Sequence, residues 1–291
     1  MNRFLQRLQT GQTLVADGAT GTNLHKMGLK PGIAPEDLVF DQPEMILKLE
    51  SAFASAGSDI LLTCTFGATR LRMKDSKYAP RAAELNQRAA ELARQATTAD
   101  MLVAGSIGPT GLLMKPYGPL TPEETLAAYS DQVRGLVAGG VDLLVIETMF
   151  AFDEADAAFK AARSVTDLPI VVSFSYDRGV RTMMGIKPAD MIRHYKEMGA
   201  VMVGANCGTS LENMEKVAGE YAAAEPGFPL WIKPNAGLPR LVDGETLYDV
   251  TPGQMGEFAR KYTALGARVV GGCCGNTPEH IAAIARSVRS E

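Results

Sequence analysis

Three of the four cysteines in this chain occupy positions that suit a metal site. Cys207 stands in the segment GANCG, and Cys273 and Cys274 form an adjacent pair in GGCCG. Three thiolates plus one replaceable ligand match a catalytic zinc site, because such sites keep one coordination position open. Two other interpretations remain: isolated cysteines are often small buried hydrophobes, and vicinal cysteines can form a disulfide or a redox pair. Cys64, the fourth cysteine, is predicted to lie outside the metal shell.

The composition is that of an ordinary globular protein. Hydrophobic residues make up 46% of the 291 residues and charged residues 21%, with a net charge of −4. This charge gives no attraction to nucleic acid or to an anionic membrane. The N-terminal segment has no apolar signal core, and no apolar run is long enough to cross a membrane, so we expect a cytoplasmic protein with reduced cysteines. Only three histidines occur, so a metal site must rely on sulfur or oxygen ligands.

Eight short apolar runs alternate with amphipathic stretches of helical length. Runs without polar alternation are typical of strands that are buried on both faces of a parallel sheet. The apolar runs begin at Thr13, Asp59, Asp100, Val141, Pro169, Ala200, Pro229 and Ala267, and the helical stretches begin near residues 42, 80, 121, 153, 187, 211, 251 and 277. This alternation predicts a (β/α)8 barrel that spans residues 1–291 as one domain. A doubly wound open sheet is the alternative.

Several of the helical stretches carry their own start signals. Residues 121–124 read TPEE, which predicts a capping box with proline at the first helical position. Residues 251–254 read TPGQ and repeat the pattern with an amide in place of the carboxylate. The last helix is expected to begin after Thr277, where His280 stands in place of the carboxylate and leaves the box incomplete.

A barrel of this type carries its chemistry at the C-terminal ends of the strands. The unusual residues stand at the ends of the apolar runs in order: Asp17 and Gly18 at the first, Glu147 at the fourth, Cys207 at the sixth, Asn235 at the seventh, and Cys273 and Cys274 at the eighth. Some of them could have a purely structural role, because Asp-Gly is a common turn pair and Asn235 precedes Gly237 in a turn-like segment. A carboxylate that ends a run as apolar as VDLLVIE is harder to explain structurally.

Seven segments together resemble the homocysteine S-methyltransferase family. They are DGATGTNL, TCTFGATRLRM, GPTG, IETM, GANCGTS, KPNAGLP and GGCCGNTPEHI, and they extend along nearly the whole chain. TFGATRLRM and KPNAGLP are most similar to the homocysteine-binding domain of cobalamin-dependent methionine synthase. The resemblance implies a (β/α)8 barrel and a zinc-dependent transfer of a methyl group to the thiol of homocysteine, which gives methionine.

The resemblance also implies a set of metal ligands. Cys207, Cys273 and Cys274 match the three zinc-binding cysteines of the family, and Asn235 matches an asparagine that fills the fourth zinc position when no thiol is bound. Zinc has a clear role in such chemistry, since a free thiol with a pKa of about 8.5 is mostly protonated at neutral pH. Coordination to Zn²⁺ deprotonates the thiol and supplies the nucleophile.

Three further residues match positions that bind the amino-acid end of homocysteine. Asp17 and Gly18 match the DG segment of the family, and Glu147 matches the glutamate at the end of the fourth strand. The carboxylates suit the ammonium group of the substrate, while backbone N–H groups of a glycine-rich segment suit its carboxylate.

The methyl donor is less well defined by the sequence. The methionine synthase-like segments imply a methylcorrinoid such as methylcobalamin, and the absence of a D-x-H-x-x-G motif implies that a separate corrinoid protein carries it. The alternative is a small donor of the S-methylmethionine or betaine type. More remote alternatives are a non-catalytic zinc-binding barrel and a phosphate-binding barrel aldolase, the latter because Gly271 and Gly272 lie where many barrels bind phosphate.

Overall fold

The structure is a computed structural model that describes residues 2–242 and 245–289, so the predicted domain of residues 1–291 extends beyond the described residues at both ends. Eight parallel strands lie in the order β1-β10-β7-β6-β5-β4-β3-β2. Their bounds are β1 Leu14–Val15, β2 Ile60–Leu62, β3 Leu102–Ile107, β4 Leu143–Met149, β5 Ile170–Phe174, β6 Met202–Cys207, β7 Leu230–Pro234 and β10 Ala267–Val270. A parallel bridge between Ala16 and Ile60 joins the first strand to the second and closes the sheet. The predicted barrel is confirmed, and the open sheet is wrong.

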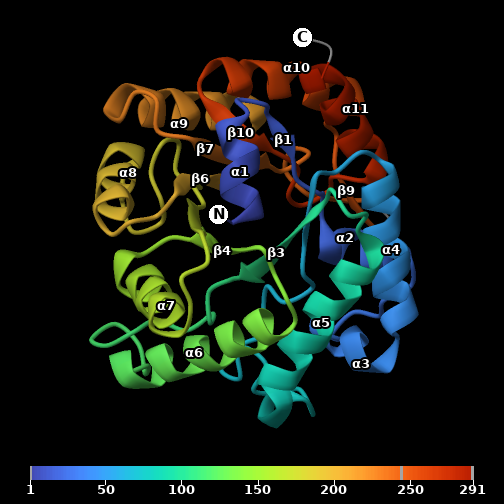
Figure 1. Cartoon of the computed structure of the whole chain (residues 1–291), viewed down its shortest axis with the longest axis vertical. Helices are drawn as coiled ribbons and strands as arrows, with labels where there is room; N and C mark the ends of the chain where they lie inside the picture. The colour runs from blue at the N-terminus through green and yellow to red at the C-terminus, as the bar shows by residue number, and fades with distance from the viewer. Residues whose placement is uncertain (1, 243–244, 290–291) are drawn as a thin grey trace.

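A ring of helices surrounds the strands (Figure 1). One long helix follows each strand: α4 Pro43–Ser55, α5 Ala82–Ala96, α6 Pro122–Ala138, α7 Phe152–Val165, α8 Pro188–Glu197, α9 Leu211–Ala224, α10 Pro252–Ala264 and α11 Pro278–Arg289. Each begins within about two residues of its predicted start. The sequence did not predict the short elements, which are α1 Arg3–Gln9, α2 Thr20–Lys26, η1 Pro35–Asp37, α3 Leu38–Asp41, η2 Ala79–Arg81 and the hairpin of β8 Arg240–Val242 and β9 Glu245–Leu247. No helix among the described residues is long and apolar enough to span a bilayer.

The predicted helix starts have the expected chemistry. Both α6 and α10 begin with a complete capping box, in which the threonine side chain and the third helical side chain each accept a backbone N–H bond. At α11 only half of the box forms, as predicted, because the Thr277 carbonyl rather than its side chain accepts the His280 N–H. The Nδ1 atom of His280 accepts the Thr277 backbone N–H at 3.2 Å, so an imidazole does the work of the carboxylate.

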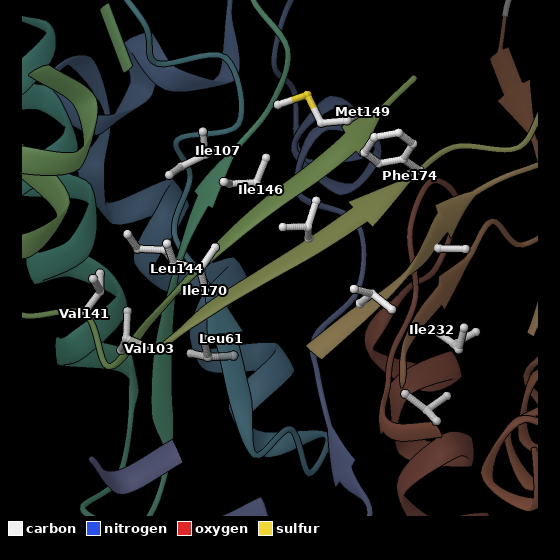
Figure 2. Close-up of a cluster of buried hydrophobic side chains, with 14 of the residues drawn as sticks. Leu61, Val103, Ile107, Val141, Leu144, Ile146, Met149, Ile170, Phe174 and Ile232 are labelled. Carbon is white, nitrogen blue, oxygen red and sulfur yellow. The ribbon is translucent and has the colours of Figure 1, made fainter. Parts of the chain in front are cut away.

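Two separate apolar layers hold the barrel together. Alternate residues along each strand point to opposite sides of the sheet. In β4, Leu144 and Ile146 pack outwards against the helices, as Figure 2 shows, while Leu143 and Val145 fill the interior of the barrel. The runs that show no polar alternation in the sequence are therefore strands with two buried faces.

The short helix α1 closes one end of the barrel. Phe4 is fully buried among the interior residues, and Figure 1 shows α1 in front of the barrel centre. The side chains of α1 bind segments that lie just before strands: Asn2 Nδ2 donates to the Asp142 carbonyl at 2.8 Å, and Arg7 pairs with Asp59 at 3.0 Å. This end is therefore the N-terminal end of the strands, and the cavity described below lies at the opposite end.

Candidate metal centre and substrate cavity

A cavity of about 670 Å³ lies at the C-terminal ends of the strands. Its volume falls within the range of about 300–1,000 Å³ that is typical of ligand pockets. The lining residues come from the C-terminal ends of β2, β3, β4, β6 and β7 and from the segments after β1, β2 and β10. The cavity therefore lies where a barrel enzyme carries its active site.

Three cysteine sulfurs meet in the wall of this cavity. The Sγ atoms of Cys207, Cys273 and Cys274 all lie within 4.8 Å of one another, and Cys207 and Cys273 are 2.9 Å apart. That distance is longer than a disulfide bond of about 2.05 Å. It is about 1 Å shorter than the separation of two sulfurs on one tetrahedral zinc, which is roughly 3.8 Å for Zn–S bonds of about 2.3 Å. The trio therefore needs only a small opening movement to fit a zinc ion.

The three thiols differ in the direction in which their pKa values are shifted. Hydrogen bonds from Cys207 and then from Cys273 lower the pKa of Cys274 to about 3. Cys64 contrasts with them, since burial raises its pKa well above the usual value, with smaller contributions from neighbouring carboxylates. Its Sγ lies 3.6 Å from the Pro35 carbonyl, in the cavity wall and outside the group of three.

The end of β7 lies between the two cysteine segments and ties them together. Asn235 Nδ2 donates to the Gly208 carbonyl at 3.0 Å, and Asn235 Oδ1 accepts the Cys274 N–H at 3.0 Å. The Cys273 N–H donates to the Pro234 carbonyl at 2.8 Å. Asn235 thus bridges the segments after β6 and β10 beside the sulfurs, and its role as fourth metal ligand stays a prediction.

A buried ion pair lies beneath the cavity. Lys233 Nζ is 2.7 Å from Asp17 Oδ1, and both side chains are 3% exposed. The second oxygen of Asp17 accepts the Leu62 N–H at 2.7 Å. Burial lowers the pKa of Lys233, but the charges of Asp17 and Glu147 outweigh burial and leave that pKa above its usual value. Lys233 lines the cavity and Asp17 does not, so the cation stands between this carboxylate and any ligand.

Lys233 lines the cavity, although the sequence suggested no binding role for it. Its signal was a lysine at the end of a run as apolar as PLWI, the same kind of signal that identified Glu147.

Glu147 lies in the cavity wall near this ion pair. Ser106 Oγ donates to Glu147 Oε1 at 2.5 Å. Burial raises the pKa of Glu147 to about 7, although the nearby Lys233 charge opposes the shift. A carboxyl group with this pKa can change its charge near neutral pH, and such groups cluster at functional sites.

Gly18 also lines the cavity, and its lack of a side chain has a packing reason. A Cβ atom at this position would lie 2.7 Å from Phe53 Cε1 and 2.8 Å from the Asn276 carbonyl oxygen. Both distances are too short for a real contact, so only glycine lets the chain pass between helix α4 and the segment after β10.

Glu36 and Arg72, for which the sequence suggested no role, also line the cavity. The Glu36 carboxylate accepts the Gly67 N–H at 2.6 Å, and Arg72 is exposed at the cavity edge. Phe66 is the one Phe, Tyr or Trp among the described residues that line the cavity.

Comparisons with known proteins agree with this geometry. The family model described as homocysteine S-methyltransferase matches residues 14–288. The structure is similar to that of the homocysteine methyltransferase MmuM from Escherichia coli. Its metallated form has a TM-score of 0.81 at 24% identity, and its oxidized form 0.78 at 26%; each match covers 98% of this chain and 99% of that one. A methyltransferase from Methanosarcina mazei shares the fold, with a TM-score of 0.63 at 12% identity over 99% of this chain and 97% of that one. The chain therefore belongs to the homocysteine S-methyltransferase family and is an enzyme that methylates homocysteine.

Proposed function

We propose that this enzyme uses one zinc ion, bound by Cys207, Cys273 and Cys274, to convert homocysteine to methionine. The observation that carries the proposal is the convergence of these three sulfurs in the wall of a cavity with room for substrate. Three thiolates without a fourth cysteine leave one position for the sulfur of the substrate. When bound, zinc keeps that sulfur as a thiolate at neutral pH. Asn235, whose side chain bridges the cysteine segments, is the proposed light-atom ligand when substrate is absent.

The charged residues beside the sulfurs suit the amino-acid end of homocysteine. Glu147 lines the cavity and receives the ammonium group, which favours its ionised form. Lys233 provides a positive charge for the carboxylate, and Asp17 holds the Lys233 ammonium in place. Gly18 also lines the cavity, and a backbone N–H at this position suits the carboxylate of the substrate. Asp17 therefore contributes to substrate binding through Lys233.

The cavity favours a small methyl donor over a corrinoid. If each non-hydrogen atom takes the roughly 30 Å³ that one water molecule occupies in the liquid, homocysteine and S-methylmethionine together need roughly 540 Å³, which fits within the cavity of about 670 Å³. A corrinoid is many times larger and would have to stay outside. Betaine fits less well, because a quaternary ammonium group calls for several aromatic faces and Phe66 is the one such ring described here. We therefore propose a sulfonium donor of the S-methylmethionine type.

The reaction with this donor balances simply. The homocysteine thiolate attacks the methyl carbon of the sulfonium, a new S–C bond forms, and the electron pair of the broken bond returns to the donor sulfur. Both acceptor and donor leave as methionine. The chain's own residues hold the two sulfurs in line and keep water away from them.

A donor-resolved assay tests this function. Zinc-loaded protein is incubated with homocysteine and one donor carrying a deuterated methyl group, which is S-methylmethionine, betaine or methylcobalamin. We expect labelled methionine with S-methylmethionine. Labelled product with methylcobalamin alone would overturn the small donor and favour a separate corrinoid protein.

The metal is tested separately by X-ray absorption. Zn–S bonds of about 2.3 Å are distinguishable from Zn–N or Zn–O bonds of about 2.0–2.2 Å. Homocysteine should raise the number of sulfur neighbours from three to four. An unchanged zinc environment, together with no methyl transfer from any donor, would favour a non-catalytic zinc-binding barrel.

A further inference from the structure

Asn206 is a fully buried amide at the end of β6, directly before the first cysteine ligand. Its Oδ1 atom accepts hydrogen bonds from the Thr148 N–H at 2.9 Å and from Ser173 Oγ at 2.7 Å. A backbone N–H can only donate, so the amide oxygen must face Thr148 and the orientation of the group is fixed. The NH₂ group of Asn206 therefore points the other way.

That NH₂ group points towards two of the three sulfurs. It donates to Thr148 Oγ1 at 2.6 Å, and its remaining hydrogen is shared between Cys207 Sγ at 3.5 Å and Cys273 Sγ at 3.8 Å. Among the described contacts, the amide makes no hydrogen bond with Cys274. Two of the three sulfurs therefore accept a hydrogen bond from Asn206 and the third does not. Metal binding by three equivalent cysteines would not require this difference.

The amide is also held rigidly. Thr148 and Cys207 both have a φ of 60°, a left-handed backbone conformation that is uncommon for residues other than glycine and is a true outlier for a β-branched residue. Asn206 bonds to the backbone and the side chain of Thr148 and to the sulfur of Cys207. Such strained positions persist only where surrounding contacts fix them, and they cluster at functional sites.

We propose that Asn206 protects Cys207 and Cys273 from methylation by the enzyme's own reaction. With substrate bound, the proposed centre holds four thiolates, and each has lone pairs that can attack a methyl carbon. A hydrogen bond to a thiolate occupies electron density that would otherwise be available for attack. The substrate sulfur lacks this bond and stays the better nucleophile. Methylation of a cysteine would form an S–C bond, release the leaving group with its electrons, and turn a charged ligand into a neutral thioether.

This inference rests on the proposed zinc centre, but its test needs neither homocysteine nor the natural donor. Methyl iodide serves as the probe, because it methylates thiolates with loss of iodide and requires no recognition site. Zinc-loaded protein is treated to a low extent of reaction, and fragment mass spectra give the S-methylation at each cysteine. Cys274 is the internal reference, since Asn206 does not contact it.

In the wild type we expect Cys274 to react ahead of Cys207 and Cys273. Asn206→Ser removes the N–H donors and should raise the reaction of both cysteines relative to Cys274 by about fivefold, the effect of one ordinary hydrogen bond. Asn206→Asp keeps an acceptor for Thr148 and Ser173 and should have the same effect. Ser173→Ala is the matched control, because it removes a bond to Oδ1 and leaves the N–H donors in place; it should keep the wild-type ratio.

Cobalt provides a second measurement without alkylation. In Co²⁺-loaded protein, loss of the N–H bonds makes the sulfurs richer in electrons, so the sulfur-to-cobalt absorption should move to longer wavelength in both Asn206 variants and not in Ser173→Ala. An unchanged methylation ratio in zinc-loaded Asn206→Ser would overturn the proposal. Loss of metal from both variants would overturn it equally, because the proposal assigns Asn206 control of sulfur reactivity rather than metal retention.

Discussion

The two ends of the barrel use their charged residues in opposite ways. At the N-terminal end, the carboxylates of Asp59 and Asp142 accept backbone N–H bonds and pair with partly exposed arginines from α1 and other helices. At the C-terminal end, Asp17, Lys233 and Glu147 are almost fully buried. Burying charge is costly unless it is well paired, so the second arrangement favours a role in binding rather than in stability.

The packing of apolar side chains also differs between the two ends of the barrel. Phe4 is fully buried at the N-terminal end and is not among the residues that line the cavity. The opposite end leaves about 670 Å³ open beside the sulfurs. The contrast implies that stability and function can be changed separately by substitutions at the two ends, as is general for barrels of this type.

The largest effect is expected for Cys273→Ala. This substitution leaves two of the three cysteine sulfurs, so zinc loading should be lost and methyl transfer should fall by about a thousandfold or more. The barrel should still fold, because the Cys273 side chain lies in the cavity wall. Zinc per chain, circular dichroism and methionine formation measure the three quantities. If Cys273→Ala kept both its zinc and its full activity, the C-terminal end of the barrel would not be the site of the metal chemistry.

Phe4→Ala tests the other end. Removal of a fully buried phenylalanine should lower the free energy of unfolding by about 3–5 kcal/mol. Zinc content and the KM for homocysteine should not change at a temperature where the variant is folded. Urea unfolding and steady-state kinetics provide the measurements, and a raised KM would show that the two ends are coupled.

Stability should depend on pH through Glu147. Its pKa in the folded protein is about 7, raised mainly by burial, so between about pH 4.5 and 7 the folded chain keeps a proton that the unfolded chain has released. The contribution of Glu147 to stability is therefore full at low pH and is lost as the pH rises through 7. Glu147→Gln should lack this loss, and its stability relative to the wild type should rise by about 3 kcal/mol between pH 4.5 and 8. Urea unfolding of the metal-free proteins at both pH values tests this, and parallel pH profiles would refute it.

The same substitution should weaken substrate binding. Glu147→Gln removes the proposed charge partner of the homocysteine ammonium, which should cost about 2 kcal/mol, or roughly thirtyfold in affinity. Zinc affinity should stay the same, because Glu147 is not one of the three residues that are placed to hold the metal ion. Calorimetric titration with homocysteine and competition with a zinc chelator separate the two effects. Equal losses of both affinities would make Glu147 a structural residue.

The smallest effect is expected for Cys64→Ala. Cys64 is buried in the cavity wall and its sulfur lies outside the trio. Removal of one buried atom should cost about 1 kcal/mol of stability. Zinc content and activity should stay near the wild-type values in the assays used for Cys273→Ala. A loss of zinc would place Cys64 in the metal shell, contrary to our prediction.

Much of the fold could be predicted because its signals are local. Strand and helix starts follow from apolar runs and capping residues, and the C-terminal strand ends then identify where chemistry belongs. The convergence of Cys207 with Cys273 and Cys274 follows from strand position in a closed barrel, although 66 residues separate the first two. Each of these inferences needs only the periodicity of the chain and one general rule of barrel architecture.

The missed features depend on contacts between distant segments. Lys233 has a role because the chain brings it to Asp17, 216 positions away, and Asn206 because its amide meets Thr148 and Cys273. Helix α1 gives little sign in the sequence that it closes the barrel, because seven residues are too few for a clear amphipathic pattern. The hydrogen bond from the Thr277 N–H to His280 could not be predicted either, because it depends on the orientation of the imidazole ring.

Strand β10 has two tasks, since it completes the sheet beside β1 and leads directly to two of the three cysteines. During synthesis on the ribosome, Cys207 emerges long before its partners, and a single thiolate holds zinc weakly. The metal site can therefore form only after the final strand has been made and has docked against the first. The proposed zinc site would then form only in chains whose barrel has closed, and chains that lack β10 would hold zinc weakly.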